Sequence, residues 1–431
     1  MIRLLHDVRC GAAAALLAGA LSLACAPATQ STTSGSISTT ATPAPSMAQP
    51  NTGGVIPGVE VLLTDSLHLL RGKRVGLITN HTGRGRTGIS TVDLLHRAPG
   101  VRLTALYAPE HGLRGTAQAG VHIASSVDSA TGVPIYSLYG ESTVPTAASL
   151  ANVDVLVSDL QDVGARVYTY LWTMALAADS SNKPFIVLDR PNPIRADRVD
   201  GGVSEPSFST LVGVYPIAMR YGLTPGEMLR YLVGTGRVSA DIKVIPMKGY
   251  SRSMWFEDTK LPWVNPSPNL RDMDASLMYT GTVYFEGVNV SEGRGTDQPF
   301  RLVGAPWLTD AGTIAAELNA KGIRGVRFDS TSRTIGAGFK FAGLTIPMIH
   351  ITISDRNAVN AAGIGLHLLR AIYKRHPTEF QWRASKMDRL AGSTRIRVAV
   401  ESEGGVEALL RTMEAESRQF QDATRPYWLY R

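Results

Sequence analysis

Cysteine is nearly absent from this chain of 431 residues, because only Cys10 and Cys25 are cysteines and both lie in the first 25 residues. Whatever folds after Cys25 therefore has no disulfide, no thiolate nucleophile and no cysteine ligand for a metal. A large excess of charge is also missing, since 43 Lys and Arg residues stand against 36 Asp and Glu residues and leave a formal charge of +7. No basic run concentrates that excess, so the composition predicts no nucleic-acid partner.

The apolar run at the N-terminus is too short to cross a membrane. Residues 11–24 fall short of the roughly 20 apolar residues of a membrane span, but match the roughly 7–15 of a signal-peptide core. We therefore predict that residues 1–24 are a signal peptide and that the protein is exported. The run ends in LSLAC, which resembles a bacterial lipobox and makes Cys25 the candidate lipidation site of a lipoprotein facing the periplasm or the cell surface. Secretion without a lipid is the alternative.

Charged residues are missing from the stretch that follows Cys25. Residues 26–54 are rich in Ser, Thr, Ala and Pro, and such a composition buries too little apolar surface to fold. We predict a flexible tether over residues 25–54, with a lipid anchor as the only link to a membrane.

Short apolar runs alternate with amphipathic stretches from Val55 onward. The runs are apolar on both faces, as expected of strands in a parallel sheet that helices cover. They predict strands over residues 74–80, 102–108, 134–140, 153–160, 184–190 and 241–247, with helices over 91–97, 168–178 and 224–233. This alternation predicts an α/β fold, a Rossmann-like doubly wound parallel sheet over residues 55–278. The different pattern of residues 279–431 predicts a smaller α+β domain, with helices near 309–321, 357–375 and 404–420 and strands over 325–330 and 344–355.

Polar side chains gather where four of the predicted strands end. Parallel strands bring their carboxyl ends to one edge of the sheet, where ligands of such sheets bind. That edge is expected to hold the candidate catalytic residues Glu110, His111, Asp159 and Asp162, and the candidate substrate-binding residues Asn80, Arg166, Tyr168, Asp189, Arg190 and Asn192. We expect some of these side chains to cap helices or to pair with one another instead.

The sequence gives little support for a dinucleotide site, a zinc site or a serine-hydrolase site. Residues 83–88 fit the G-x-G-x-x-G pattern of a dinucleotide site, but His81 and Thr82 separate them from the strand end and two arginines crowd the loop. His81, His111 and His122 lack the spacing of a zinc site, and no G-x-S-x-G elbow marks a serine hydrolase. We therefore predict no cofactor and no metal.

A compact polar loop after Glu286 adds three candidates for substrate binding, Glu292, Arg294 and Thr296. Two glycines flank Arg294 and predict a tightly turned backbone that presents its guanidinium. Such a group either forms interdomain ion pairs or binds an acidic substrate, and the sequence leaves both open.

A carboxylate-rich cleft without an evident cofactor suits glycoside hydrolysis, which usually needs one carboxyl group as proton donor and a second as base or nucleophile. Glu110 is the candidate acid because Pro109 and Gly112 hold it in a turn with little freedom. The aromatic residues Tyr168, Tyr170, Trp255 and Trp263 would either stack on sugar faces or pack in the core.

Five ordered motifs, NHTG, YAPEHGLRG, DLQDVGARVYTY, DRPNP and NVSEGRGT, resemble those of the NamZ-type exo-β-N-acetylmuramidases over about residues 56–431. The resemblance implies a Rossmann-like domain, a smaller C-terminal domain, and an active-site cleft between them. It also implies release of N-acetylmuramic acid (MurNAc) from the non-reducing ends of peptidoglycan fragments, by hydrolysis of β-1,4 bonds. Glu110 would be the catalytic glutamate, and the lactyl carboxylate of MurNAc would bind Arg166, Arg190 or Arg294.

The second catalytic group stays open between Asp159, Asp162, Glu292 and the substrate's own N-acetyl group. Two other functions stay open as well. One is a lipid-anchored, non-catalytic binder of wall fragments, and the other is a nucleotide-dependent enzyme.

Overall fold

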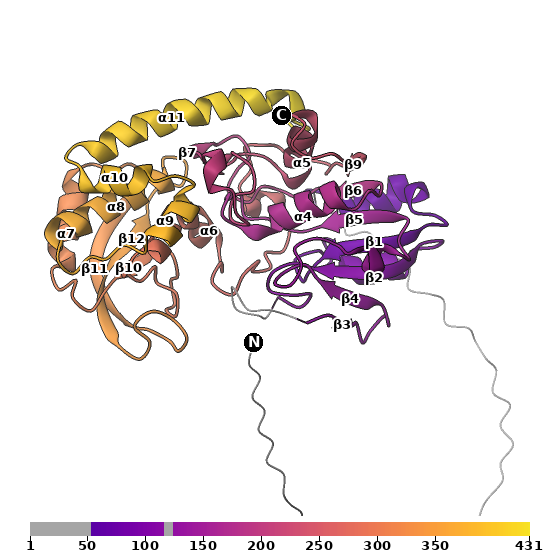
Figure 1. Cartoon of the computed structure of the whole chain (residues 1–431), viewed down its shortest axis with the longest axis horizontal. Helices are drawn as coiled ribbons and strands as arrows, with labels where there is room; N and C mark the ends of the chain where they lie inside the picture. Colours follow the sequence, from indigo (N-terminus) through magenta and orange to yellow (C-terminus); the bar gives the residue numbers. More distant parts are fainter. Residues whose placement is uncertain (1–52, 116–123) are drawn as a thin grey trace, which may run out of the picture. The chain divides into compact units, whose positions relative to one another are not determined.

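A seven-stranded sheet organises the first part of the chain in the computed structural model, which describes residues 53–115 and 124–431 (Figure 1). The predicted signal peptide, Cys25, the tether as far as residue 52, and His122 lie outside the described residues. Residues Gly53–Arg431 belong to one compact unit. Within the described ranges, no helix combines the length and the apolar character that a membrane crossing requires.

The order of the strands is β3-β4-β2-β1-β5-β6-β9, and every neighbouring pair is parallel except β3 with β4. The strands are β1 (Arg74–Thr79), β2 (Arg102–Ala108), β3 (Ser126–Val127), β4 (Pro134–Ser137), β5 (Val155–Asp159), β6 (Phe185–Leu188) and β9 (Ile242–Ile245). The order runs outward in one direction from β1 to β2 and β4, and in the other from β5 to β6 and β9. This is the order of a doubly wound Rossmann sheet, whose direction reverses between β1 and β5. The predicted fold class is therefore confirmed.

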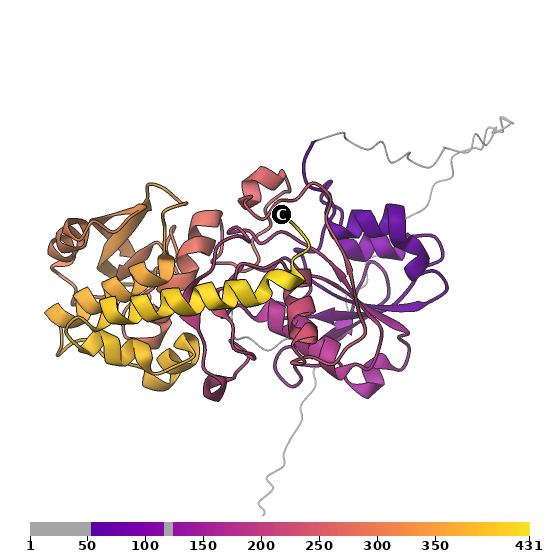
Figure 2. The same cartoon turned by 90° about the horizontal axis from the view of Figure 1, so that it is seen from above.

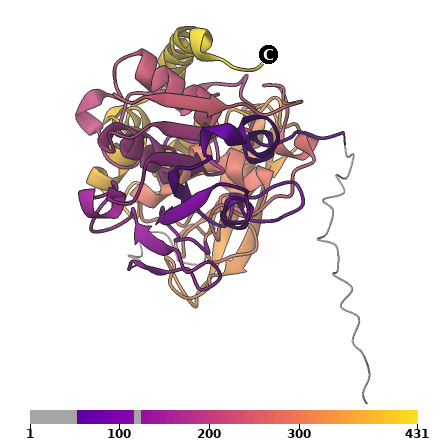
Figure 3. The same ribbon diagram turned by 90° about the vertical axis from the view of Figure 1, so that its right-hand side faces the viewer.

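Successive side chains of a strand point to opposite faces of a sheet, and here the side chains on both faces are buried. Val155 and Val157 of β5 pack into one apolar cluster with Leu95, whereas Leu156 packs into another with Trp172. Helices α1 (Gly58–Val61) and α2 (Thr91–His96) pack against strands, as does α5 (Pro225–Gly234), which also packs against α4 (Thr169–Ser180). Figure 3 views the molecule from the side of this sheet.

The second part of the chain contains an antiparallel sheet with the order β10-β12-β11 and five helices. Its elements are β10 (Leu302–Gly304), α7 (Ala311–Ala320), β11 (Val326–Thr334), β12 (Thr345–Ile353), α8 (Ala361–Arg375), α9 (Ala384–Ala391), α10 (Arg395–Glu401) and α11 (Gly405–Thr424). Helix α11 runs along α8 and α10 and reaches the two-stranded sheet of β7 (Asp200–Val203) and β8 (Ala218–Arg220) (Figure 2). Helices α9 and α10 and the β7–β8 sheet were not predicted.

The remaining long helix of the described ranges, α6 (Met273–Thr282), packs closely on α8, and the other remaining elements are short. The short ones are α3 (Ala147–Leu150), η1 (Leu62–Ser66), η2 (Leu67–Leu69), η3 (Pro206–Phe208), η4 (Phe256–Thr259), η5 (Val283–Gly287) and η6 (Arg425–Tyr427). The close packing needs a glycine, because a Cβ at Gly281 would lie 1.8 Å from the carbonyl oxygen of Ala361.

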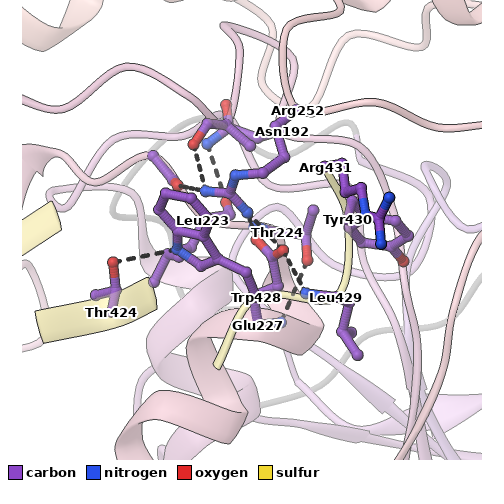
Figure 4. A network of polar contacts seen from close by, with 12 residues as sticks. Asn192, Leu223, Thr224, Glu227, Arg252, Thr424, Trp428, Leu429, Tyr430 and Arg431 are labelled. Carbon is purple, nitrogen blue, oxygen red and sulfur yellow. Dashed lines mark hydrogen bonds and ion pairs between the residues drawn. The ribbon is translucent and has the colours of Figure 1, made fainter. Parts of the chain in front are cut away.

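The C-terminal residues pack back onto the large sheet through a buried polar network (Figure 4). Glu227 and Arg252 form a buried ion pair, and the backbone N–H of Leu429 donates to Glu227 at 2.9 Å. The guanidinium of Arg252 lies 3.8 Å from the centre of the Trp428 ring. The aromatic tail therefore packs over a buried ion pair and adds a backbone hydrogen bond and a ring contact to it.

Candidate active site

A pocket of about 260 Å³ lies where the loop after β2 and the start of α4 face α6, η5 and α9. Its lining residues come from both sides of position 278, which the sequence predicted as a domain boundary. They are Glu110, His111, Tyr139, Val167, Tyr168, Thr169, Val212, Ser267, Leu270, Tyr279, Glu286, Arg294, Phe300, Lys386 and Leu390. Four of the predicted site residues are among them: Glu110, His111, Tyr168 and Arg294.

Glu110 lies in a tight turn that follows β2. The backbone N–H of Gly112 donates to the carbonyl of Pro109 at 3.0 Å, and His111 and Gly112 have positive φ angles of 70° and 72°. Positive φ is unusual for a histidine, so the turn is strained at the residue that follows Glu110. The sequence-based prediction of a restrained glutamate is consistent with this geometry.

The Glu110 carboxylate is 9% exposed and accepts a hydrogen bond of 2.7 Å from the hydroxyl of Thr169. Thr169 is the first residue of α4, so the carboxylate lies at the positive end of that helix. Tyr139 lines the same pocket beside Glu110. Burial, followed by the neighbouring Glu110 charge, raises the pKa of Tyr139 to about 12.

A second carboxyl group, that of Glu286, lines the same pocket and is held by two cations. It forms ion pairs with the guanidinium of Arg294 and with the ammonium of Lys386, the latter at 2.9 Å. The Arg294 guanidinium lies 4.9 Å from the centre of the Phe300 ring, and its Nε is buried without a partner among the described residues. Arg294 therefore keeps a donor that its own ion pairs do not use.

Aromatic rings form another wall of the pocket. The Tyr168 ring lies 4.6 Å from the ring of Tyr170 and 6.4 Å from that of Tyr279, both in edge-on arrangements. The Tyr168 hydroxyl is buried and has no hydrogen-bond partner within the described ranges. A buried hydroxyl without a partner is costly, which makes this atom a candidate to contact a ligand. Trp255 and Trp263 do not line the pocket.

Asp159 and Arg190 do not line the pocket but pair with each other. Both carboxylate oxygens of Asp159 accept from the Arg190 guanidinium, and one also accepts from the hydroxyl of Thr91. Asp159 is fully buried and Arg190 nearly so. These contacts are those of a structural ion pair rather than of groups that face a substrate.

Asp162 is also buried outside the pocket lining, where it organises the chain before α4. Its carboxylate accepts from the backbone N–H groups of Gly164 at 2.9 Å and Leu171 at 3.2 Å, and from the hydroxyl of Tyr221. Burial raises the pKa of Asp162 to about 6, although these hydrogen bonds oppose the shift.

Asp189 and Asn192 likewise have structural partners. The Asp189 carboxylate accepts from the backbone of Gly226 and the hydroxyl of Thr224, both at 2.8 Å, and from Tyr430 at 2.6 Å. Burial raises the pKa of Asp189 to about 7. Asn192 donates to the carbonyl of Leu223 at 2.9 Å.

Arg166 does not line the pocket but contacts residues that do. Its guanidinium donates to the carbonyls of Val212 at 3.2 Å and Leu390 at 2.7 Å, and both of these residues line the pocket. The Arg166 side chain therefore connects two parts of the pocket wall that are far apart in the sequence.

The other predicted binding residues lie in turns next to the site. Asn80 accepts from the backbone N–H of Thr82 at 3.0 Å. Thr296 donates to the carbonyl of Gly293 at 2.6 Å. Glu292 pairs with Lys340 at 3.0 Å and with Arg294 at 3.2 Å. Burial alone would raise the pKa of Glu292, but the two cations lower it to about 2.

The glycine-rich loop at residues 83–88 serves the packing of the chain itself. A Cβ at Gly83 would lie 2.2 Å from the Thr79 hydroxyl oxygen and 2.8 Å from the Asp159 carbonyl oxygen. Arg86, within the loop, pairs with Glu60 at 2.8 Å. The described residues include no group of three or more His, Cys, Asp or Glu side chains placed to hold a metal ion.

The pocket residues that sequence reasoning did not select as site residues include Tyr139, Thr169, Tyr279, Glu286 and Lys386. Thr169 lies within the quoted VYTY run, directly after Tyr168, so the signal was present. Lys386 lies on α9, a helix that was not predicted, and no pattern in the sequence connects it to Glu286.

Comparisons with known proteins find matches over most of the chain. Residues 75–274 match the family model described as exo-beta-N-acetylmuramidase NamZ, N-terminal, and residues 277–430 match the model for its C-terminal part. The chain is 40% identical over 377 residues to the peptidoglycan beta-N-acetylmuramidase NamZ of Bacillus subtilis (strain 168), covering 86% of this chain and 91% of that protein.

Two crystal structures of DUF1343 family proteins from Bacteroides fragilis NCTC 9343 are similar to this one. The first has a TM-score of 0.82 at 34% identity and covers 88% of this chain and 100% of that one. The second has a TM-score of 0.69 at 29% identity and covers 88% and 99%.

Proposed function

The chain belongs to the NamZ family of exo-β-N-acetylmuramidases, which are glycoside hydrolases, and from this we propose that it releases MurNAc from the non-reducing ends of peptidoglycan fragments. The reaction is hydrolysis of the β-1,4 bond that follows the terminal sugar. One observation supports the proposal above others: Glu110, the glutamate of the P-E-H-G motif, lies in a small pocket that also contains a second carboxyl group and two cations.

The size of the pocket supports exo action. About 260 Å³ is below the roughly 300–1,000 Å³ of pockets that hold drug-sized ligands. Such a space suits one sugar ring better than a length of glycan chain. An enzyme that accepts one terminal residue acts from the end of the chain.

Glu110 is the proposed general acid and base. It is restrained by the turn and by the Thr169 hydroxyl, so its carboxyl group can be held against the glycosidic oxygen. Glu286 is the proposed second catalytic carboxyl group, because it lines the pocket whereas Asp159, Asp162 and Glu292 do not. Assistance by the N-acetyl group of the substrate is the alternative.

The cations on the Glu286 side are the proposed site for the lactyl carboxylate of MurNAc. Arg294 keeps a buried Nε without a partner in the described part of the chain, and Lys386 is 44% exposed with one carboxylate partner. A carboxylate that binds here would accept charge-assisted hydrogen bonds from these cations. N-acetylglucosamine (GlcNAc) lacks this group, so the same contacts would distinguish the two sugars.

The test compares two chromogenic sugars, para-nitrophenyl β-MurNAc and para-nitrophenyl β-GlcNAc. We expect release from the MurNAc compound only. Oligosaccharides with MurNAc at the non-reducing end should lose that residue, and those that begin with GlcNAc should stay intact. A folded protein that binds wall fragments but releases neither sugar would overturn the proposal and favour the non-catalytic binder.

We also propose that the protein is exported and anchored by a lipid on Cys25. The proposal rests on the apolar run over residues 11–24, the LSLAC sequence and the uncharged stretch that follows. Mass spectrometry of the membrane fraction tests it, because a diacylglycerol adduct on an N-terminal Cys25 is expected. A soluble exported protein cleaved elsewhere would contradict the anchor.

A further inference from the structure

A second and larger pocket, of about 570 Å³, shares no lining residue with the candidate active site. It lies between the segment leading into β7, the loop before α8, and one side of α11. Six of its nineteen lining residues are arginines, and only two are carboxylates, Asp200 and Glu414. Its lining is therefore strongly cationic.

Three of the arginines are already neutralised by carboxylates. Arg195 pairs with Asp197 at 2.6 Å, and Arg418 pairs with Glu414 on the same helix. Arg356 contacts two carboxylates, at 2.6 Å and 2.9 Å. Arg195 and Arg356 also lie 6.0 Å and 5.7 Å from the centre of the Trp255 ring, which holds them at the pocket wall.

The other three arginines are not fully satisfied by the protein. Arg198 and Arg324 are exposed and form no ion pair or hydrogen bond with any residue of the described ranges. Arg220 is 2% exposed, and its Nε is buried without an acceptor in the same ranges. Buried guanidinium donors normally have partners, so an unpaired one in a pocket wall indicates a place for an acceptor from outside the chain.

The remaining features of the pocket also favour an anion. Its lining includes Asn360, which caps the fifteen-residue helix α8, so the positive end of that helix adjoins the pocket. Asp200, a half-buried carboxylate of the lining, contacts Arg220 at 3.4 Å. Burial raises the pKa of Asp200, and the neighbouring Arg220 guanidinium opposes this shift.

We propose that this pocket is a second binding site, for a ligand that carries phosphate or carboxylate oxyanions. Arg198 and Arg324 would bind the charged groups from the open side, and the unpaired Nε of Arg220 would donate from the floor. Guanidinium groups recognise both kinds of oxyanion through paired N–H donors.

Calorimetric titration of the purified protein tests the proposal, with inorganic phosphate, pyrophosphate and citrate as probes at constant ionic strength. We expect saturable binding of at least one probe. The Arg198→Ala/Arg324→Ala double variant should weaken it at least tenfold. Arg327→Ala removes an arginine that is 71% exposed and lies outside the pocket, and should leave the affinity unchanged. Lys386→Met should also leave it unchanged, which separates this site from the candidate active site.

The probes distinguish the two kinds of oxyanion, phosphate and carboxylate. Binding of phosphate or pyrophosphate without citrate indicates a phosphate ligand, and the reverse indicates a carboxylate ligand. Either result supports the site, and neither depends on muramidase activity. Absence of saturable binding overturns the proposal, as does equal binding by the double variant, or an equal loss in Arg327→Ala.

Discussion

Asp159 and Arg190 form a buried ion pair at the point where the strand order of the large sheet reverses. Asp159 ends β5, which lies beside β1, and the crevice between two such strands is where ligands of doubly wound sheets usually bind. Only about 10 Å³ of space remains next to Arg190, roughly the room for one water molecule. The candidate active site is instead the pocket around Glu110.

We predict that Asp159→Asn lowers the free energy of unfolding by about 3–5 kcal/mol, because it leaves the buried Arg190 without its partner. Urea denaturation measures the change. Asp154→Asn is the matched control, since Asp154 pairs with Arg74 at the surface and its loss should cost much less. An Asp159→Asn protein with normal stability but no hydrolysis would instead place Asp159 in the chemistry.

Removing one hydroxyl from the C-terminal tail should destabilise the sheet. Tyr430→Phe loses the hydrogen bond to Asp189 at 2.6 Å and the one from the backbone N–H of Met247 at 2.9 Å. We expect a loss of about 1–3 kcal/mol in unfolding free energy. Tyr427→Phe is the control, because no hydrogen bond of the Tyr427 hydroxyl is found within the described ranges. Equal stability of the two variants would contradict a role for the tail network.

The raised pKa of Asp162 leads us to predict that the stability of the protein depends on pH. Its pKa is raised by burial from 3.8 to about 6 in the folded protein, so the folded state binds the proton more tightly than the unfolded state. The stabilisation from this proton is complete below about pH 4 and is lost as the pH rises through 6. A shift of about two units corresponds to roughly 3 kcal/mol.

The comparison with Asp162→Asn isolates this effect. The amide does not titrate, so the stability advantage of the unmodified protein over the variant should shrink by up to roughly 3 kcal/mol between pH 4 and pH 7. Urea denaturation at several pH values measures it. A constant difference between the two proteins over that range would show that Asp162 does not titrate there.

Lys386→Met should weaken substrate binding rather than the chemical step. Lys386 lines the pocket at its exposed side and has one carboxylate partner, Glu286. Loss of a charge-assisted contact to the lactyl carboxylate should raise KM for the MurNAc substrate about tenfold with little change in kcat. Lys374→Met removes an exposed lysine outside the pocket and should change neither constant. A fall in kcat alone would argue that Lys386 acts by positioning Glu286.

Much of the fold was predictable because strands buried on both faces leave continuous apolar runs in the sequence. The runs that became β1, β2 and β5 are examples. Which polar residues face a ligand was not predictable. Arg190 turns to Asp159 and Asp189 turns to Tyr430, and both contacts depend on how distant segments pack. The turn that holds Glu110 was predictable because Pro109 and Gly112 encode it locally.

The central claim is that Glu110 is the catalytic acid and base, and Glu110→Gln tests it most directly. Glutamine keeps the shape of the side chain but cannot transfer the proton. We expect release of MurNAc from a MurNAc–GlcNAc fragment, whose leaving sugar must be protonated, to fall by about 10²–10⁴-fold, with the thermal unfolding temperature nearly unchanged. Glu60→Gln, at a carboxylate outside the pocket, should retain activity. Turnover by a folded Glu110→Gln protein within a few-fold of the unmodified enzyme would contradict the account.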